Sequence, residues 1–126
     1  YWDDLKGEKY LLYVPNAGHD LRERDANGSP QLIPERAVNT LSAFARSQVF
    51  GKPMPALGWE CSEAEGVCRL AVKSEAKPKR VRVWTADADT RDFRKARWVE
   101  DAKAELPATV TAPAKGFRAF YAETEY

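Results

Sequence analysis

The chain has 126 residues, the length of one domain or of pieces of two. Hydrophobic residues make up 44% of it and aromatic residues 11%, which is enough for a core and excludes an intrinsically disordered protein. The net charge of +1 excludes a strong long-range attraction to nucleic acid, and no segment approaches the roughly 18 apolar residues of a transmembrane helix. We therefore expect a globular protein with no nucleic-acid partner and no transmembrane segment.

A buried strand is expected close to the start of the chain. Lys9–Val14 carries a continuous apolar run, which is typical of a strand covered on both faces in a parallel sheet. Pro15 ends this strand because proline has no N–H to donate. The opening YWDDLKGEKY has neither an initiator Met nor a signal peptide. We expect both ends of the chain to lie inside a longer polypeptide.

The next feature is a turn that carries the single histidine of the chain, His19. Asn16 and Gly18 tolerate positive φ, so the chain can turn sharply and place His19 at the carboxyl end of the strand. Open α/β sheets bind ligands at that end. We predict that His19 is catalytic and that Asn16 and Gly18 bind beside it. The alternative is an exposed polar loop residue without a chemical role.

A histidine in this position can take the proton of a nucleophile and return it to a leaving group. The other members of a Ser-His-Asp triad are missing, because the chain has no G-x-S-x-G and Ser29 follows no strand. Asp20 adjoins His19 but is expected to point away from it. Asp3 and Asp4 lie upstream, where the acid of such a triad stands. A complete triad is not expected within this chain.

A helix and a linker follow the histidine turn. From Pro34 to Phe50 apolar residues recur at steps of three and four, which indicates an amphipathic helix. Pro34 suits the first turn and Gly51 the position after the end. The proline-rich KPMPALGW then marks a linker. We therefore predict that residues 1–52 are the carboxyl-terminal piece of an α/β-hydrolase-like domain: last strand, histidine loop and final helix.

Beyond the linker the pattern changes to short strands with alternating polarity. This predicts an all-β sandwich of the immunoglobulin or fibronectin type in residues 53–126. Six strands are one fewer than the usual seven, so the sandwich is expected to lack its last strand. Its expected core aromatics are Trp59, Trp84, Trp98 and Phe120. The predicted strands are Leu57–Ser62, Val67–Lys73, Arg80–Ala86, Phe93–Asp101, Ala108–Ala112 and Phe117–Thr124.

Two cysteines, Cys61 and Cys68, lie within GWECSEAEGVCRLAV. The pattern predicts a hairpin that turns around Glu63–Gly66, so that the two cysteines face each other on neighbouring strands. Opposed residues have Cα atoms about 4.5 to 5.5 Å apart, which is within disulfide range. We predict a Cys61–Cys68 disulfide and hence an oxidising compartment. The alternative is two buried thiols; no further Cys or nearby His completes a metal site.

Four pieces of the sequence, taken together, point to a known family. They are GEKYLLYVPNAGH, the helical segment, LGWE, and PKRVRVWTADADTRDFRKARW. The most specific parts are Tyr13–His19 and Thr90–Trp98, and together the pieces resemble the PhoPQ-activated pathogenicity-related protein family over nearly the whole chain. That family also resembles a secreted autocrine proliferation repressor. The resemblance implies an α/β-hydrolase-like protein with a β-sandwich, located in the periplasm or secreted.

The resemblance also implies roles for individual residues. His19 of the N-A-G-H motif corresponds to the general base, and the nucleophile and the acid fall in an upstream hydrolase portion outside this chain. The implied reaction is hydrolysis or transfer of an acyl group from a small acyl or peptide substrate, of esterase or peptidase type, without cofactor or metal. The alternative is a non-catalytic secreted binding protein whose sandwich contacts a protein or a glycan. We expect this chain alone to be inactive.

Overall fold

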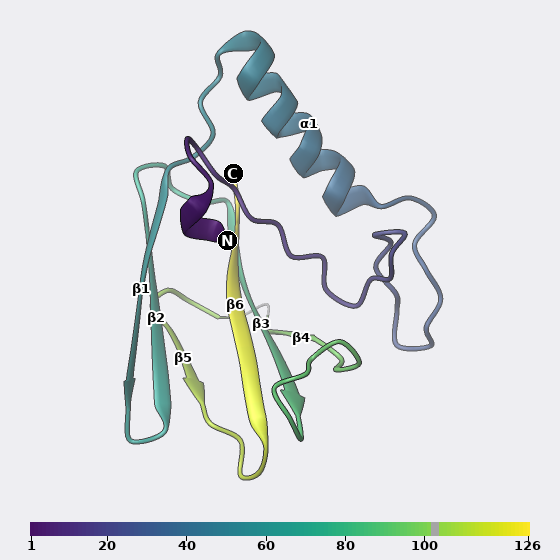
Figure 1. Ribbon diagram of the computed structural model, residues 1–126, viewed down its shortest axis with the longest axis vertical. Helices are drawn as coiled ribbons and strands as arrows, with labels where there is room; N and C mark the ends of the chain where they lie inside the picture. The colour runs from purple at the N-terminus through teal and green to yellow at the C-terminus, as the bar shows by residue number, and fades with distance from the viewer. Residues whose placement is uncertain (102–103) are drawn as a thin grey trace. The chain divides into compact units, whose positions relative to one another are not determined.

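The computed structural model describes residues 1–101 and 104–126, which form two compact units, Tyr1–Lys52 (unit 1) and Pro53–Tyr126 (unit 2). Unit 1 contains a 3-10 helix, η1 (Trp2–Asp4), and an α-helix, α1 (Glu35–Phe50), with a long irregular segment between them (Figure 1). Unit 2 contains the strands β1 (Leu57–Ala64), β2 (Val67–Ser74), β3 (Arg80–Ala88), β4 (Val99–Asp101), β5 (Ala108–Thr111) and β6 (Phe117–Glu125).

Helix α1 lies where the sequence predicts it. It follows Pro34, and it ends at Gly51, whose φ of 62° is the left-handed conformation that commonly terminates a helix. None of its residues is buried, and Leu41 and Val49 are 67% and 72% exposed. The rest of unit 1 therefore leaves the apolar positions of the helix largely uncovered.

The predicted α/β fragment is wrong. Lys9–Val14 forms no strand, and Tyr10–Tyr13 are exposed. A strand needs neighbours that accept its N–H groups and donate to its carbonyls, and the described part of unit 1 has only isolated bridges. The segment instead runs beside α1, where the rings of Tyr10 and Phe44 meet edge to face at 6.0 Å between centroids (Figure 1). The described protein is mostly β-structure with one α-helix.

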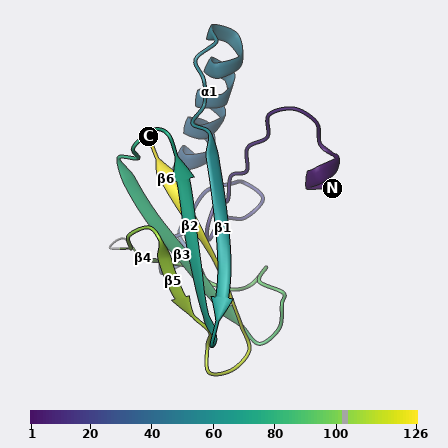
Figure 2. The same ribbon diagram turned by 90° about the vertical axis from the view of Figure 1, so that its left-hand side faces the viewer.

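Unit 2 consists of two three-stranded antiparallel sheets, with strand orders β1-β2-β5 and β4-β3-β6. Figure 2 shows β1 and β2 in front, with β3 and β6 crossing behind them. Val83 of β3 packs with Ala108 and Val110 of β5, and Phe120 and Ala122 of β6 extend this cluster. The two sheets therefore share one hydrophobic core, as in a small β-sandwich.

The four expected core aromatics have different environments. Phe120 packs against the core between the sheets. Trp84 is only 6% exposed, but it alternates to the opposite face of β3, where its ring stacks on that of Tyr121 at 6.4 Å. Trp98 meets the same tyrosine ring at 5.1 Å. Trp59 is 63% exposed, so the prediction that it is a core residue is wrong.

Candidate functional site

His19 lies at the tip of a tight turn in unit 1. The turn spans Gly18–Leu21 and is closed by the Leu21 N–H, which donates to the Gly18 carbonyl oxygen at 3.0 Å. His19 and Asp20 are its central residues, and both are exposed. The imidazole is therefore accessible to a group that approaches from solvent.

The loop that carries this turn has two residues in the left-handed conformation. They are Asn16, with a φ of 54°, and Leu21, with a φ of 56°. The Asn16 carbonyl accepts a hydrogen bond from the Arg24 N–H at 3.1 Å, which closes the loop at its base. Asn16 thus has the positive φ that the sequence predicts, whereas Gly18 does not.

Gly18 is a close-approach glycine. A Cβ built at this position would lie 3.0 Å from Nη1 of Arg24 and 3.3 Å from Oδ1 of Asp20. Both separations are tighter than ordinary van der Waals contact, so a side chain here would require the ends of the Arg24 and Asp20 side chains to shift by a few tenths of an ångström. The absence of a side chain at Gly18 lets Arg24 and Asp20 meet beneath the turn.

Asp20 is the partner of two arginines. Its carboxylate accepts from Nε of Arg22 at 3.1 Å and from Nη2 of Arg24 at 3.2 Å. Desolvation raises the pKa of Asp20, but the hydrogen bonds from the two arginines outweigh it and hold this pKa below its ordinary value. The carboxylate of Asp20 is thus engaged by Arg22 and Arg24.

A second ion pair joins the loop to α1. Arg36 donates through Nε to Oε1 of Glu23 at 2.8 Å and through Nη2 to Oε2 at 3.1 Å. Both side chains are only 17% exposed, so this two-pronged pair is shielded from solvent. The sequence analysis missed it because the partners are 13 residues apart and follow no periodic pattern.

The described residues assemble no catalytic group around His19. None of their carboxylates forms a hydrogen bond with its ring, and Asp3 and Asp4 lie in η1. Within the described ranges there is also no group of three or more side chains that could hold a metal ion. No helix of this part of the chain is long and apolar enough to cross a membrane. Among the described residues, His19 thus has no carboxylate partner for its ring.

The cysteines lie in a different register from the predicted one. The β1–β2 turn consists of Glu65 and Gly66, with φ of 51° and 74°, the two-residue turn that matches strand twist. Cys61 therefore lies opposite Leu70 rather than opposite Cys68. The two cysteines are diagonal neighbours on one face of the hairpin, and no disulfide joins them, so the predicted direct pairing is wrong.

The thiol of Cys68 is poorly suited to nucleophilic catalysis. Desolvation is the largest effect that raises its pKa, followed by the charge of Glu63 and by the charge and hydrogen bond of Cys61. A raised pKa keeps the thiol protonated, and the thiolate is the nucleophilic form. The pair is therefore unlike a catalytic cysteine site.

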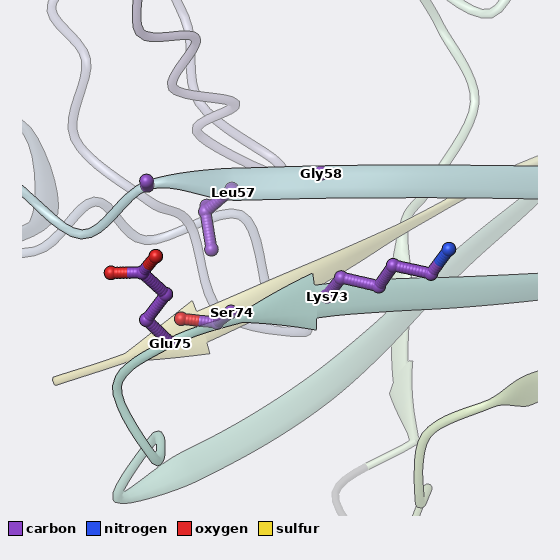
Figure 3. A pocket seen from close by; sticks show the side chains of 6 residues that line it. Leu57, Gly58, Lys73, Ser74 and Glu75 are labelled. Atoms are coloured by element: carbon purple, nitrogen blue, oxygen red, sulfur yellow. The ribbon is translucent and has the colours of Figure 1, made fainter.

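A shallow depression lies at the open end of the β1–β2 hairpin. Figure 3 shows the side chains of Leu57, Ser74 and Glu75 at the strand ends, while Lys73 extends away along its strand. The Ser74 hydroxyl accepts a hydrogen bond from the Tyr126 hydroxyl at 2.7 Å. The depression lacks a histidine or an acid–base pair, so it does not resemble a catalytic pocket. Its lining residues are Ala56, Leu57, Gly58, Lys73, Ser74 and Glu75.

The arginines on the outer face of the second sheet are neutralised by neighbouring acids. Arg82 is 13% exposed, and its guanidinium lies 3.1 to 3.5 Å from three carboxylates. These belong to Glu100, Glu123 and Glu125. A cation surrounded in this way is not available to an anionic ligand, so this face is not an anion site.

Comparison with known proteins identifies the family of the chain. The sequence profile described as PhoPQ-activated pathogenicity-related protein matches residues 1–94. The chain belongs to this family. The resemblance found in the sequence is thereby confirmed. The match to the PhoPQ-activated family includes the His19 loop, α1 and the strands β1 to β3.

One relative of this PhoPQ-activated family member is the autocrine proliferation repressor protein A of Dictyostelium discoideum, which is 26% identical over 153 residues. The match covers 100% of this chain but 29% of the relative, so the chain spans less than a third of that protein's length. No solved structure gives a significant match.

Proposed function

We propose that the intact protein is an acyl hydrolase or acyltransferase of esterase or peptidase type and that His19 is its general base. Membership in the PhoPQ-activated family supports this proposal. The observation that carries it is the Gly18–Leu21 turn, which holds an exposed imidazole at the tip of a braced loop. The bracing comes from the ion pairs of Asp20 with Arg24 and of Glu23 with α1.

In this role His19 accepts the proton of a hydroxyl nucleophile as the nucleophile's oxygen bonds to the acyl carbon. It then transfers that proton to the leaving group as the original acyl bond breaks. Water attacks the acyl-enzyme in the second half, and the histidine returns the water's proton to the nucleophile. The nucleophile and the acid that orients His19 belong to an upstream hydrolase portion outside these residues. Asn16 and Gly18 border the bound substrate, and no cofactor takes part.

We propose that the protein works in the periplasm or is secreted, where Cys61 and Cys68 are oxidised to a disulfide. Their diagonal position on one face of the hairpin supports this, because both side chains lie on the same side of neighbouring strands. To test this proposal, the protein is purified after export by its own host, alkylated without prior reduction, and its intact mass is measured. A species two hydrogens lighter and unlabelled at both cysteines is expected. Labelling of both cysteines contradicts the disulfide.

The second candidate function is that of a non-catalytic binding protein that contacts a protein or glycan through its β-sandwich. Trp59 favours it, because a tryptophan that is 63% exposed on an edge strand is unusual in a monomeric domain. Every residue of β1 is exposed, so the whole strand is accessible. In this case the His19 loop has only a structural role.

Activity of the intact protein with a panel of acyl esters and peptide substrates distinguishes the two functions. We expect His19→Ala to lower turnover by about 100-fold or more without lowering the melting temperature. Gln31→Ala is the matched control, because Gln31 is an exposed polar residue of the same unit and its backbone N–H still reaches the Glu23 carbonyl.

A fluorophosphonate probe gives a second readout that does not depend on the choice of substrate. It labels an activated serine, and labelling should fall with His19→Ala but not with Gln31→Ala. Unchanged turnover and labelling in His19→Ala contradict the general-base role. An intact, folded protein that neither reacts with the probe nor turns over any substrate favours the binding function.

A further inference from the structure

The inner face of β1 carries apolar side chains. Cys61 lies opposite Leu70 of β2, and Leu70 lies opposite Ala108 of β5, which is buried in the core. Directly paired residues share a face of the sheet, so Cys61 points to the core side. Because side chains alternate along a strand, Leu57 and Trp59 point to the same side. We call Leu57, Trp59 and Cys61 the β1 strip.

The β1 strip is not covered, although it faces the same side as the core. Leu57 is 45% exposed and Trp59 63%, whereas Ala108, two strands away on the same face, is 4% exposed. The other face of this hairpin is polar and carries the ion pair of Lys73 with Glu60. The hairpin thus has the alternation of a strand with a buried inner face, but nothing in the described part of unit 2 buries the strip.

The reason is the offset between the two three-stranded sheets. At its C-terminal end the edge strand β6 lies across from β2, because the hydroxyl of Tyr126, next to the end of β6, donates to the Ser74 hydroxyl at the end of β2. Near its start β6 contacts β5, where Arg118 donates to the Thr111 carbonyl at 2.9 Å. Figure 2 shows β6 crossing behind β2. Within the described part of unit 2, no strand continues the second sheet to the position opposite β1.

The edge of β6 that would bear such a strand is open. β6 has nine residues and pairs with β3 along its whole length on one side. No described strand pairs with its other side, so alternate N–H and C=O groups there face away from the sheet. A strand bonded to this edge would lie about 4.8 Å beyond β6, in front of the β1 strip. One strand would therefore both form hydrogen bonds with the open edge of β6 and bury the β1 strip.

We propose that a seventh strand, from a part of the same polypeptide outside residues 1–126, pairs with β6 and buries the β1 strip. It carries apolar residues at alternate positions toward Leu57, Trp59 and Cys61 and polar residues outward. The length of the relative supports this source, because more than two-thirds of that protein lies outside the matched region. The inference concerns unit 2 and does not depend on a catalytic role of His19.

The test compares residues 1–126 with the intact polypeptide. We expect alkylation of reduced Cys61 to be at least about 10-fold slower in the intact polypeptide, and the outward amides of β6 to exchange more slowly by a similar factor. The amides of β3 are the internal control, because β3 is paired on both sides in either form. Equal Cys61 and β6 accessibility in the two forms overturns the proposal.

Paired variants give an independent readout. In residues 1–126, Trp59→Ser should change the melting temperature by less than about 2 °C, because the side chain is mostly exposed. In the intact polypeptide the same change should lower it by about 5 °C or more. Ser62→Ala, on the outer face of β1, should have little effect in both forms. Light scattering shows whether residues 1–126 form a dimer. If they do and the β1 strip is protected in that dimer, a second copy covers the surface and the proposal is overturned.

Discussion

Glu23 and Arg36 form a two-pronged ion pair that joins the His19 loop to the first turn of α1. The two side chains are each 17% exposed, so water competes weakly for their hydrogen bonds. The Gln31 N–H donates to the Glu23 carbonyl at 2.9 Å and fixes the backbone at the same residue. Glu23 therefore links the loop to α1 through both its side chain and its backbone carbonyl.

Removal of this pair should loosen unit 1. We expect Arg36→Ala to destabilise unit 1 by about 1 to 2 kcal/mol, because it leaves a partly buried carboxylate without its principal partner. Urea unfolding followed by helical circular dichroism measures the effect. Arg46→Ala, which removes an exposed arginine from the same helix, should leave the midpoint nearly unchanged. Equal midpoints for the two variants would show that the pair contributes nothing to stability.

Gly18 and Arg24 should be energetically coupled. Gly18→Ala introduces a methyl group 3.0 Å from the Arg24 guanidinium and should weaken its pair with Asp20. In the Arg24→Ala background that obstacle is gone, so the same methyl should be better tolerated. A double-mutant cycle in urea should give a coupling of about 0.5 kcal/mol or more. Additive effects of the two substitutions contradict the close contact.

The stability of unit 2 should fall in acid through Asp87. Arg118 donates to both carboxylate oxygens of Asp87 at 2.6 Å, and these hydrogen bonds hold its pKa below the ordinary 3.8. The unfolded chain therefore binds its proton at a higher pH than the folded chain. The contribution of the pair is complete above the unfolded pKa and is lost as the pH falls through the folded one.

Urea midpoints of unit 2, followed by tryptophan fluorescence between about pH 5 and pH 2, measure this loss. Asp87→Asn should flatten the pH dependence in that window, whereas Asp89→Asn, which changes an exposed carboxylate just beyond the end of β3, should change it less. Equally steep curves for the wild type and Asp87→Asn exclude this pair as the cause of the acid dependence.

Two glycines of unit 2 should respond oppositely to alanine. Gly116 has a φ of 78°, and a Cβ there would collide with the backbone carbonyl oxygen of Ala88. Gly116→Ala should therefore cost about 2 kcal/mol or more. Gly58 in β1 has room for a Cβ, with Lys73 Cβ at 3.9 Å, so Gly58→Ala should be neutral or stabilise by up to about 1 kcal/mol. Similar thermal midpoints for both variants contradict this assignment.

Sequence patterns locate most of the elements of unit 2 and the helix of unit 1, because these depend on local periodicity. The alternation of Arg82, Val83 and Trp84 gives β3, and Pro34 and Gly51 bracket α1. β4 is an exception, since it has only three residues where Phe93–Asp101 was predicted. Strand type and position can thus be predicted where polarity alternates, but strand length is less certain.

Features that depend on distant partners could not be predicted. Lys9–Val14 has the composition of a strand, yet a strand exists only when a neighbour accepts its hydrogen bonds. The hairpin register depends on Glu65, which has a φ of 51°, a conformation that glutamate seldom adopts. The resulting two-residue turn places Cys61 opposite Leu70 rather than opposite Cys68. At the candidate site the sequence singles out His19 but not the pair of Glu23 that braces its loop.

Helix α1 has an apolar stripe but no buried residue, which affects how the two units respond to stress. A helix of this length is marginal in water unless one face is packed. Within unit 1, α1 has no buried residue, so the rest of that unit gives it little hydrophobic support. Unit 2, with a core shared by two sheets, has cooperative packing that unit 1 lacks. We therefore expect unit 1 to open before unit 2 under heat or proteolysis, and the His19 loop, which is tied to α1 through Glu23 and Arg36, to lose its shape with the helix.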